Sequence, residues 1–156
     1  MTFPRRILVP TDFSPASENA IDRAVALAKA VDGYIVLLHA FEPVHGLPQA
    51  FMAAMTRATD AAEHEARQSL ARAAETRQSN AVAISVVMQP GPAWRVIVST
   101  ARDDGMDLIV MATHGWMHHH DRSDLHRALV GSVTEKVVRS APCPVLTVPS
   151  SAPNPG

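Results

Sequence analysis

Apolar residues along this chain gather in short runs that alternate with longer stretches in which they recur at helical spacing. The short runs are rich in Val, Ile and Leu, which is typical of strands buried on both faces of a parallel sheet. They predict five strands, at residues 7–10, 34–40, 82–88, 108–112 and 145–148. Helices are predicted between them, at residues 16–31, 48–77, 92–102 and 129–139.

The first predicted helix carries recognisable signals at both ends. Ser14 is a plausible N-cap, Pro15 suits the first turn, and Gly33 closes the helix. Because strand and helix alternate along the chain, right-handed crossovers place helices on both faces of the sheet. We therefore expect one α/β domain with a doubly wound parallel sheet over residues 1–149, followed by a disordered tail at residues 150–156, which holds only Ser, Ala, Pro, Asn and Gly.

The most polar and turn-rich strand exits are those of the first and fourth strands. The first strand leads into Pro10, Thr11 and Asp12, and the fourth ends in Met111, Ala112, Thr113, His114 and Gly115. In doubly wound sheets the ligand crevice lies outside the carboxyl ends of the strands, where the strand order reverses. If the two strands are neighbours, both loops face one crevice.

A second glycine turn, at Gly131, opens the last predicted helix. Backbone N–H groups at a helix start have no intrahelical acceptor and sit at the positive end of the helix dipole, so this turn and the one at Gly115 favour an anion such as phosphate. Ser132 and Glu135 also match a capping box, in which side chains satisfy those N–H groups instead. The two interpretations remain open together.

Composition excludes several classes of protein. A chain of 156 residues with a formal net charge of -1 and no basic stripe is not expected to bind nucleic acid or anionic lipid. No apolar segment is long enough for a signal peptide or a membrane span, and the single cysteine, Cys143, indicates a reducing compartment. These features predict a cytoplasmic protein.

Several motifs, in this order, give the chain a specific resemblance to the universal stress protein family. They are the segments at residues 7–14, 37–40, 111–115, 129–139 and 141–148. The resemblance implies a fold of the adenine-nucleotide alpha-hydrolase type, with five strands in the order 3-2-1-4-5. It also implies a homodimer formed through the last strand, Val145–Val148.

One branch of that family binds ATP, with Mg²⁺ as a possible companion, and the resemblance implies roles for named residues. Pro10, Thr11 and Asp12 would meet the adenine and ribose, and Ala40 would line the base pocket. Gly115, Gly131, Ser132, Val133 and Thr134 would hold the phosphates, flanked by Met111 and His114. Ala112 stands where the pattern begins with glycine, and the spacer at residues 116–130 is six residues longer than the pattern has. An alanine forced into a left-handed conformation would cost about 1 kcal/mol.

The longer spacer contains a cluster of histidines. His118, His120 and Asp124 are candidate metal ligands, but consecutive histidines point in different directions, so we expect a solvated loop rather than a metal site. We assign no catalytic residue: no Walker lysine pattern occurs, His114 is expected to contact ligand, and His39 is expected to be a hydrogen-bonded structural residue.

The sequence therefore predicts a small regulatory protein that binds ATP or a related adenine nucleotide during stress. Two alternatives remain open. One is a slow ATP hydrolase, so that any enzyme activity is at most weak. The other is a scaffold without nucleotide, in which Ser132 and Glu135 only cap their helix.

Overall fold

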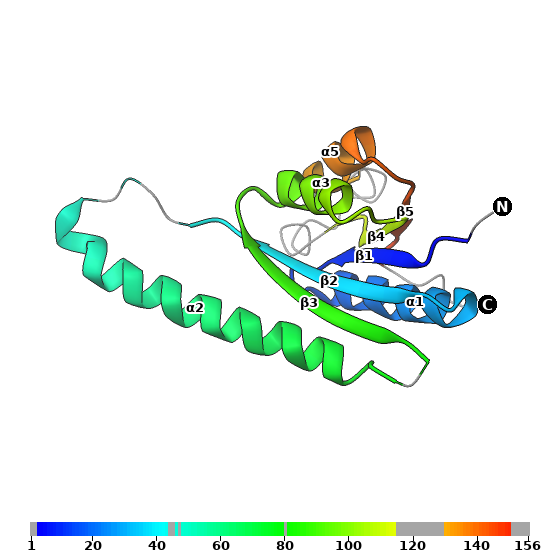
Figure 1. Ribbon diagram of the computed structural model, residues 1–156. Helices are drawn as coiled ribbons and strands as arrows, with labels where there is room; N and C mark the ends of the chain where they lie inside the picture. The colour runs from blue at the N-terminus through cyan, green and yellow to red at the C-terminus, as the bar shows by residue number, and fades with distance from the viewer. Residues whose placement is uncertain (1–2, 44–45, 47, 80, 115–129, 151–156) are drawn as a thin grey trace.

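The computed structural model describes residues 3–43, 46, 48–79, 81–114 and 130–150. Its centre is a five-stranded sheet in the order β3-β2-β1-β4-β5, and every neighbouring pair is parallel (Figure 1). The strands are β1 (Arg6–Pro10), β2 (Tyr34–Phe41), β3 (Ala83–Pro90), β4 (Leu108–Ala112) and β5 (Val145–Val148). The predicted α/β class and strand order are confirmed, with strand bounds within two residues of the prediction.

The helices cover both faces of the sheet, as predicted. They are α1 (Pro15–Val31), α2 (Gln49–Glu75), α3 (Ala93–Asp103) and α5 (Ser132–Ser140). Successive strand residues point to opposite faces. Ile7 and Val9 of β1 therefore pack with α1 and α2, whereas Leu8 packs with α3 and α5. All three are fully buried, so the sheet separates two apolar layers.

Helix α1 begins and ends as its sequence predicts. The Ser14 side chain accepts a hydrogen bond from the Ser17 N–H at 3.2 Å, and Pro15 occupies the first turn. At the other end Asp32, with φ 53°, takes the left-handed position, and Gly33 donates its N–H back to the Ala28 carbonyl at 2.9 Å. Gly33 is needed for another reason, since a Cβ there would lie 2.7 Å from the backbone oxygen of Arg5.

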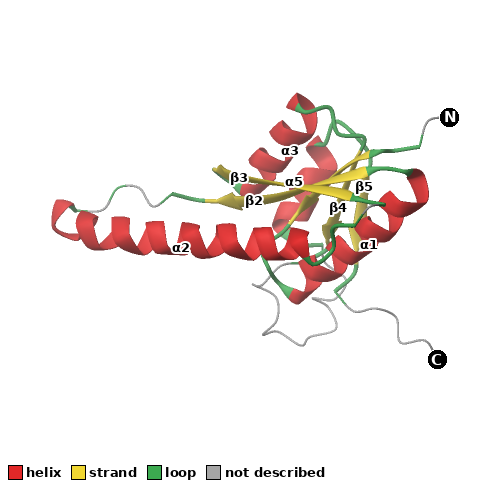
Figure 2. Cartoon of the chain, turned by 60° about the horizontal axis from the view of Figure 1, so that its bottom comes forward, coloured by secondary structure: helices red, strands yellow, loops and turns green. Residues whose placement is uncertain are grey.

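Helix α2 extends well past the body of the protein (Figure 1, Figure 2). Its last turns bury Leu70, Ala73 and Ala74 against the α1 face of the sheet, whereas Phe51 and Met52 in its first turn are 61% and 48% exposed. At about 1.5 Å per residue, a helix of this length outreaches the strands that it covers.

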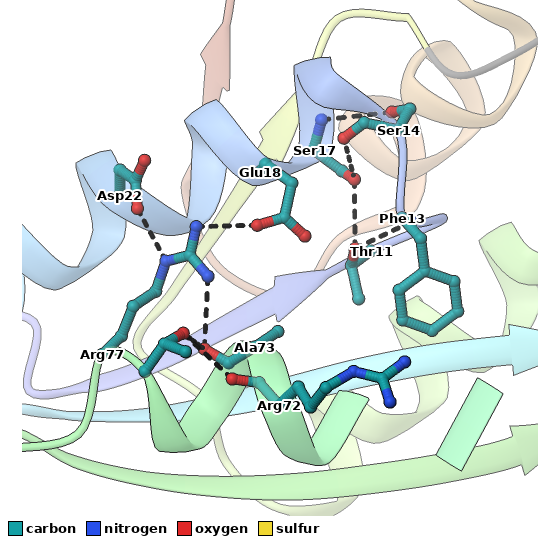
Figure 3. A network of polar contacts seen from close by, with 10 residues as sticks. Thr11, Phe13, Ser14, Ser17, Glu18, Asp22, Arg72, Ala73 and Arg77 are labelled. Carbon is teal, nitrogen blue, oxygen red and sulfur yellow. Dashed lines mark hydrogen bonds and ion pairs between the residues drawn. The ribbon is translucent and has the colours of Figure 1, made fainter. Parts of the chain in front are cut away.

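An arginine two residues after the end of α2 ties that helix to α1 (Figure 3). Arg77 donates to Asp22 Oδ1 at 2.6 Å and to Glu18 Oε2 at 2.7 Å. Burial alone would lower the pKa of Arg77, but the Asp22 hydrogen bond and the Glu18 charge outweigh it and raise that pKa. Among the described helices, none is long and apolar enough to cross a membrane. The predicted tail, apart from Ser150, lies outside the described residues.

Candidate functional site

A cavity opens at the carboxyl edge of the sheet, where β1 and β4 end side by side. The two strands pair in register, Ile7 with Leu108 and Leu8 with Ile109, so the predicted neighbourhood is confirmed. The cavity measures about 160 Å³. A single water needs only about 10–15 Å³ by this kind of measure, so the space suits a larger ligand. The mostly apolar lining consists of Pro10, Thr11, Asp12, Ser17, Leu38, Ala40, Ala93, Ile97, Met111, Ala112, Val133 and Thr134.

Most residues that the sequence proposed for a ligand site lie together in this lining. They are Pro10, Thr11, Asp12, Ala40, Met111, Ala112, Val133 and Thr134. His114, Gly131 and Ser132 lie beside the cavity without lining it, and Gly115 lies outside the described residues, as do His118, His120 and Asp124. No cluster of three metal-ligand side chains occurs within the described part of the chain.

Sequence reasoning missed Ser17, Leu38, Ala93 and Ile97. The sequence could have indicated Leu38, because it lies two residues before Ala40 in a strand and alternate strand residues point to the same face. It could also have indicated that Ala93 and Ile97 share a face, because they lie four residues apart in α3. Ser17 follows the N-cap Ser14 by three residues, within the first turn of α1, which starts at the same edge of the sheet.

The loop after β1 is held by hydrogen bonds to β2. Thr11 donates its N–H to the Leu38 carbonyl at 2.8 Å, and His39 Nδ1 lies 2.8 Å from the Thr11 carbonyl. A carbonyl oxygen only accepts, so Nδ1 of His39 carries the proton, and His39 has the structural role that we expected. Phe13, in a left-handed conformation with φ 63°, lies with its ring 4.5 Å from that of His39.

Asp12 is fixed at the cavity wall by a local turn. One carboxylate oxygen accepts the Ser14 N–H at 3.0 Å, the geometry of an Asx turn. Next to it, two buried hydroxyls form a chain of hydrogen bonds (Figure 3). Thr11 Oγ1 lies 3.0 Å from Ser17 Oγ, and Ser17 Oγ donates to the Ser14 carbonyl at 2.9 Å. The cavity thus has a polar patch made of oxygen atoms.

The start of α5 differs from the predicted capping box. Its N-cap is Gly131, and no described side chain caps the helix. Ser132 is the first helical residue and not the N-cap. In a capping box its hydroxyl would accept the Glu135 N–H, but that N–H donates to the Gly131 carbonyl at 2.9 Å. The alternative interpretation, in which Ser132 and Glu135 form a capping box, is therefore wrong. The N–H groups of residues 132–134 have no intrahelical acceptor and sit at the positive end of the helix.

Close packing joins β4 to the start of α5. Gly131 donates its N–H to the Thr113 carbonyl at 2.8 Å, and a Cβ at Gly131 would lie 3.0 Å from that oxygen. Thr134 Oγ1 donates to the Ala112 carbonyl at 3.0 Å. Ala112 pairs with Val148 in the sheet and is not among the described non-glycine residues with positive φ, so it carries no left-handed strain.

His114 lies beside these contacts. It is partly buried, its Nδ1 is 3.1 Å from Thr113 Oγ1, and its Cα would be 3.6 Å from a Cβ at Gly131. The imidazole is therefore next to the start of α5.

The sequence and the fold of this chain are similar to those of one protein family. The model of the universal stress protein family matches residues 4–149. Universal stress protein MJ0531 of Methanocaldococcus jannaschii is 31% identical over 146 residues, covering 92% of this chain and 81% of its own. The solved structure of UspA from Lactobacillus plantarum has a TM-score of 0.72 at 27% identity and covers 91% of this chain and 95% of its own. A universal stress protein solved in complex with cAMP has a TM-score of 0.59 at 26% identity, with coverage of 95% and 98%.

Proposed function

The chain belongs to the universal stress protein family, and from that premise we propose that it is a small regulatory protein that binds ATP or a related adenine nucleotide. The observation that carries the proposal is the cavity between β1, β4, α3 and α5, which has an apolar middle, a carboxylate on its wall and helix N–H groups at its edge. A relative of known structure in complex with cAMP supports an adenine nucleotide as the class of ligand.

Each part of such a nucleotide has a matching part of the cavity. The planar base fits between the apolar side chains of Leu38, Ala40 and Met111. Asp12 accepts hydrogen bonds, as ribose hydroxyls require. The N–H groups at the start of α5 take phosphate oxygens, and a helix N-terminus adds about 0.3–1 kcal/mol for each anionic group placed there.

Mg²⁺ enters this proposal only with the nucleotide. Asp12 is the one carboxylate in the lining formed by the described residues. Proteins commonly hold Mg²⁺ through one or two carboxylates together with substrate phosphates, so the donor set suits a metal that arrives with ATP rather than a resident ion.

Binding, rather than catalysis, is the role that the lining supports. The described lining holds one carboxylate and three hydroxyl side chains, and no lysine or arginine. Phosphoryl transfer depends on positioned cations and a positioned base around the phosphates. We therefore propose a ligand-dependent switch; a slow ATP hydrolase is the alternative, recognised by release of ADP in proportion to protein.

We also propose that the protein acts as a homodimer through β5. This strand lies at an edge of the sheet and pairs only with β4 among the described strands. Leu146 on β5 is 44% exposed and Val138 on α5 is 52% exposed. A two-fold interface would cover this apolar edge on both copies. The cytoplasmic location remains a prediction.

The test of nucleotide binding combines mass spectrometry of the purified protein with thermal denaturation in millimolar ATP and Mg²⁺. A ligand that binds only the folded state raises the melting temperature by mass action. Asp12→Asn is expected to weaken ATP binding about tenfold, because charge-assisted hydrogen bonds are lost. Asp60→Asn, at an exposed position of α2, is the matched control. No co-purified nucleotide, together with no thermal shift, would rule the proposal out in favour of a scaffold.

A further inference from the structure

We infer that Phe13 is a positioning residue: its strained backbone fixes the carboxylate of Asp12 at the cavity wall. This inference rests on the proposed function, since Asp12 lines the cavity proposed for the nucleotide. Phe13 has φ 63°, in the left-handed region that bulky residues rarely adopt. Such strain persists only where the surrounding contacts over-determine the backbone, and it is commonest at functional sites.

The left-handed backbone of Phe13 lies inside the turn that holds Asp12. Asp12 Oδ1 accepts the Ser14 N–H at 3.0 Å, so the hydrogen-bonded ring of this Asx turn spans Phe13. Ser14 is the N-cap of α1 and is fully buried, which fixes the far side of the turn. Rotation of Phe13 to negative φ would therefore move Asp12 relative to Ser14 and break the hydrogen bond to its carboxylate.

Backbone and ring contacts together hold Phe13 in this conformation. Its N–H donates to Thr11 Oγ1 at 3.0 Å (Figure 3). Its ring lies 4.5 Å from the ring of His39, tilted by 34°, and packs against the apolar cluster on the α1 side of the sheet. His39 is itself fixed, because its Nδ1 lies 2.8 Å from the Thr11 carbonyl. The N–H bond is open to any residue except proline, whereas the ring contacts need an aromatic side chain.

A glycine at this position would take the same conformation without strain, but it would not be held there. Glycine adopts positive and negative φ about equally readily, so without the ring contacts the Asx turn would be formed in only about half of the molecules. Phe13 instead holds one conformation through its ring, and Asp12 is in place before a ligand arrives. A ligand that meets a preformed group binds more tightly, because no loop has to be ordered on binding.

The experiment compares Phe13→Ala with Phe13→Gly, which both remove the ring but differ in the Cβ that disfavours positive φ. Dissociation constants for ATP are measured by calorimetry at one Mg²⁺ concentration, and thermal denaturation without ATP records the stability lost with the ring. Phe13→Ala is expected to weaken ATP binding about tenfold, because the left-handed conformation becomes a minor one. Phe13→Gly is expected to weaken it only about twofold.

A second background tests whether Phe13 acts through Asp12. Phe13→Ala is combined with Asp12→Ala, which removes the carboxylate and the Asx turn together. A residue that only positions this carboxylate has no further effect on ATP affinity once the carboxylate is gone. A role confined to packing would instead weaken ATP binding by the same factor in both backgrounds.

Asp32→Ala is the matched control, because Asp32 is the other non-glycine residue with positive φ in the part of the chain that the structure describes. It ends α1 at the opposite edge of the sheet, where Tyr34 pairs with Arg6 at the start of β1. Alanine tolerates this conformation less well than aspartate, so the control is expected to lose stability and keep its ATP affinity. If Phe13→Ala does not fold, Phe13→Leu serves instead; it keeps apolar packing, loses the ring contact and weakens binding in the same direction.

The outcomes separate this inference from the proposed function. No ATP binding by the natural protein overturns both. Equal ATP affinity in the natural protein and in Phe13→Ala overturns positioning and leaves nucleotide binding standing. Equally weak binding by the alanine and glycine variants assigns the effect to the ring and overturns the role of the backbone. An effect of Phe13→Ala that persists in the Asp12→Ala background overturns the link to the carboxylate.

Discussion

Gly131→Ala tests whether the close approach of β4 and α5 builds the anion-binding end of the cavity. The backbone at Gly131, with φ -59° and ψ 151°, suits any residue, so the substitution adds no conformational strain. Its new methyl lies 3.0 Å from the Thr113 oxygen and 3.6 Å from the Cα of His114, both backbone atoms that cannot rotate away. The start of α5 must therefore move by a few tenths of an ångström.

That shift lengthens the 2.8 Å hydrogen bond from the Gly131 N–H to the Thr113 carbonyl. A hydrogen bond of this kind is worth about 1 kcal/mol net. In a chain of this size such a loss lowers the melting temperature by about 2–4 °C. Because the N–H groups of residues 132–134 move with the helix, ATP binding is expected to weaken about tenfold.

Calorimetry with ATP and thermal denaturation without it measure the two effects separately. Gly105→Ala is the control, because Gly105 has φ +60° and an alanine there also costs about 1 kcal/mol. Gly105 lies between α3 and β4, at the opposite edge of the sheet from the cavity, so this variant is expected to lose stability and keep its ATP affinity. Gly131→Ala with the stability and affinity of the natural protein would refute the reasoning.

Two further predictions concern the rest of the molecule. Asp107 accepts the N–H groups of Arg5 and Arg6 at 3.1 Å and 2.9 Å and pairs with the Arg6 guanidinium at 3.0 Å, contacts that lower the pKa of its carboxyl. The stability from this carboxylate is present above its ordinary pKa of about 3.9 and is lost as pH falls through the lowered value. Asp107→Asn should therefore lower the melting temperature at pH 7 and have little effect near pH 2; an equal effect at both would contradict the assignment. For the proposed dimer, Leu146→Lys should convert it to monomer in sedimentation velocity, and an unchanged dimer would place the interface elsewhere.

The fold was predictable because its signals are long and redundant. The buried strands repeat apolar residues over their whole length, and α1 carries Ser14 and Pro15 at its start. Two details at helix ends come from single positions that the sequence did not identify. At the end of α1 Asp32 takes the left-handed conformation, and at the start of α5 the N-cap is Gly131 rather than Ser132. Each is a shift of one residue, which a periodic pattern does not resolve.

The site was predictable where strand exits supply it and less so where helices do. Thr11 and Asp12 follow β1, Ala112 is the last residue of β4, and the topology alone brings β1 and β4 together. Ser17 and Ile97 reach the same cavity from helices, and which helical residue faces the cavity depends on how each helix is rotated against the sheet. The helical period places Ala93 and Ile97 on one face of α3, but the rotation that turns this face toward the cavity is set by packing.

The cavity has opposite hydrogen-bonding character at its two polar parts, which favours one orientation of the proposed nucleotide. Around Thr11, Asp12 and Ser17 the wall presents oxygen lone pairs, whereas the start of α5 presents N–H groups at the positive end of a helix. An adenine nucleotide is complementary to this arrangement, because its ribose hydroxyls donate and its phosphates accept. The reverse orientation would set phosphate against the Asp12 carboxylate and leave the helix N–H groups against apolar ring carbons. Both mismatches would cost binding energy, so these donors and acceptors favour one direction of the proposed nucleotide.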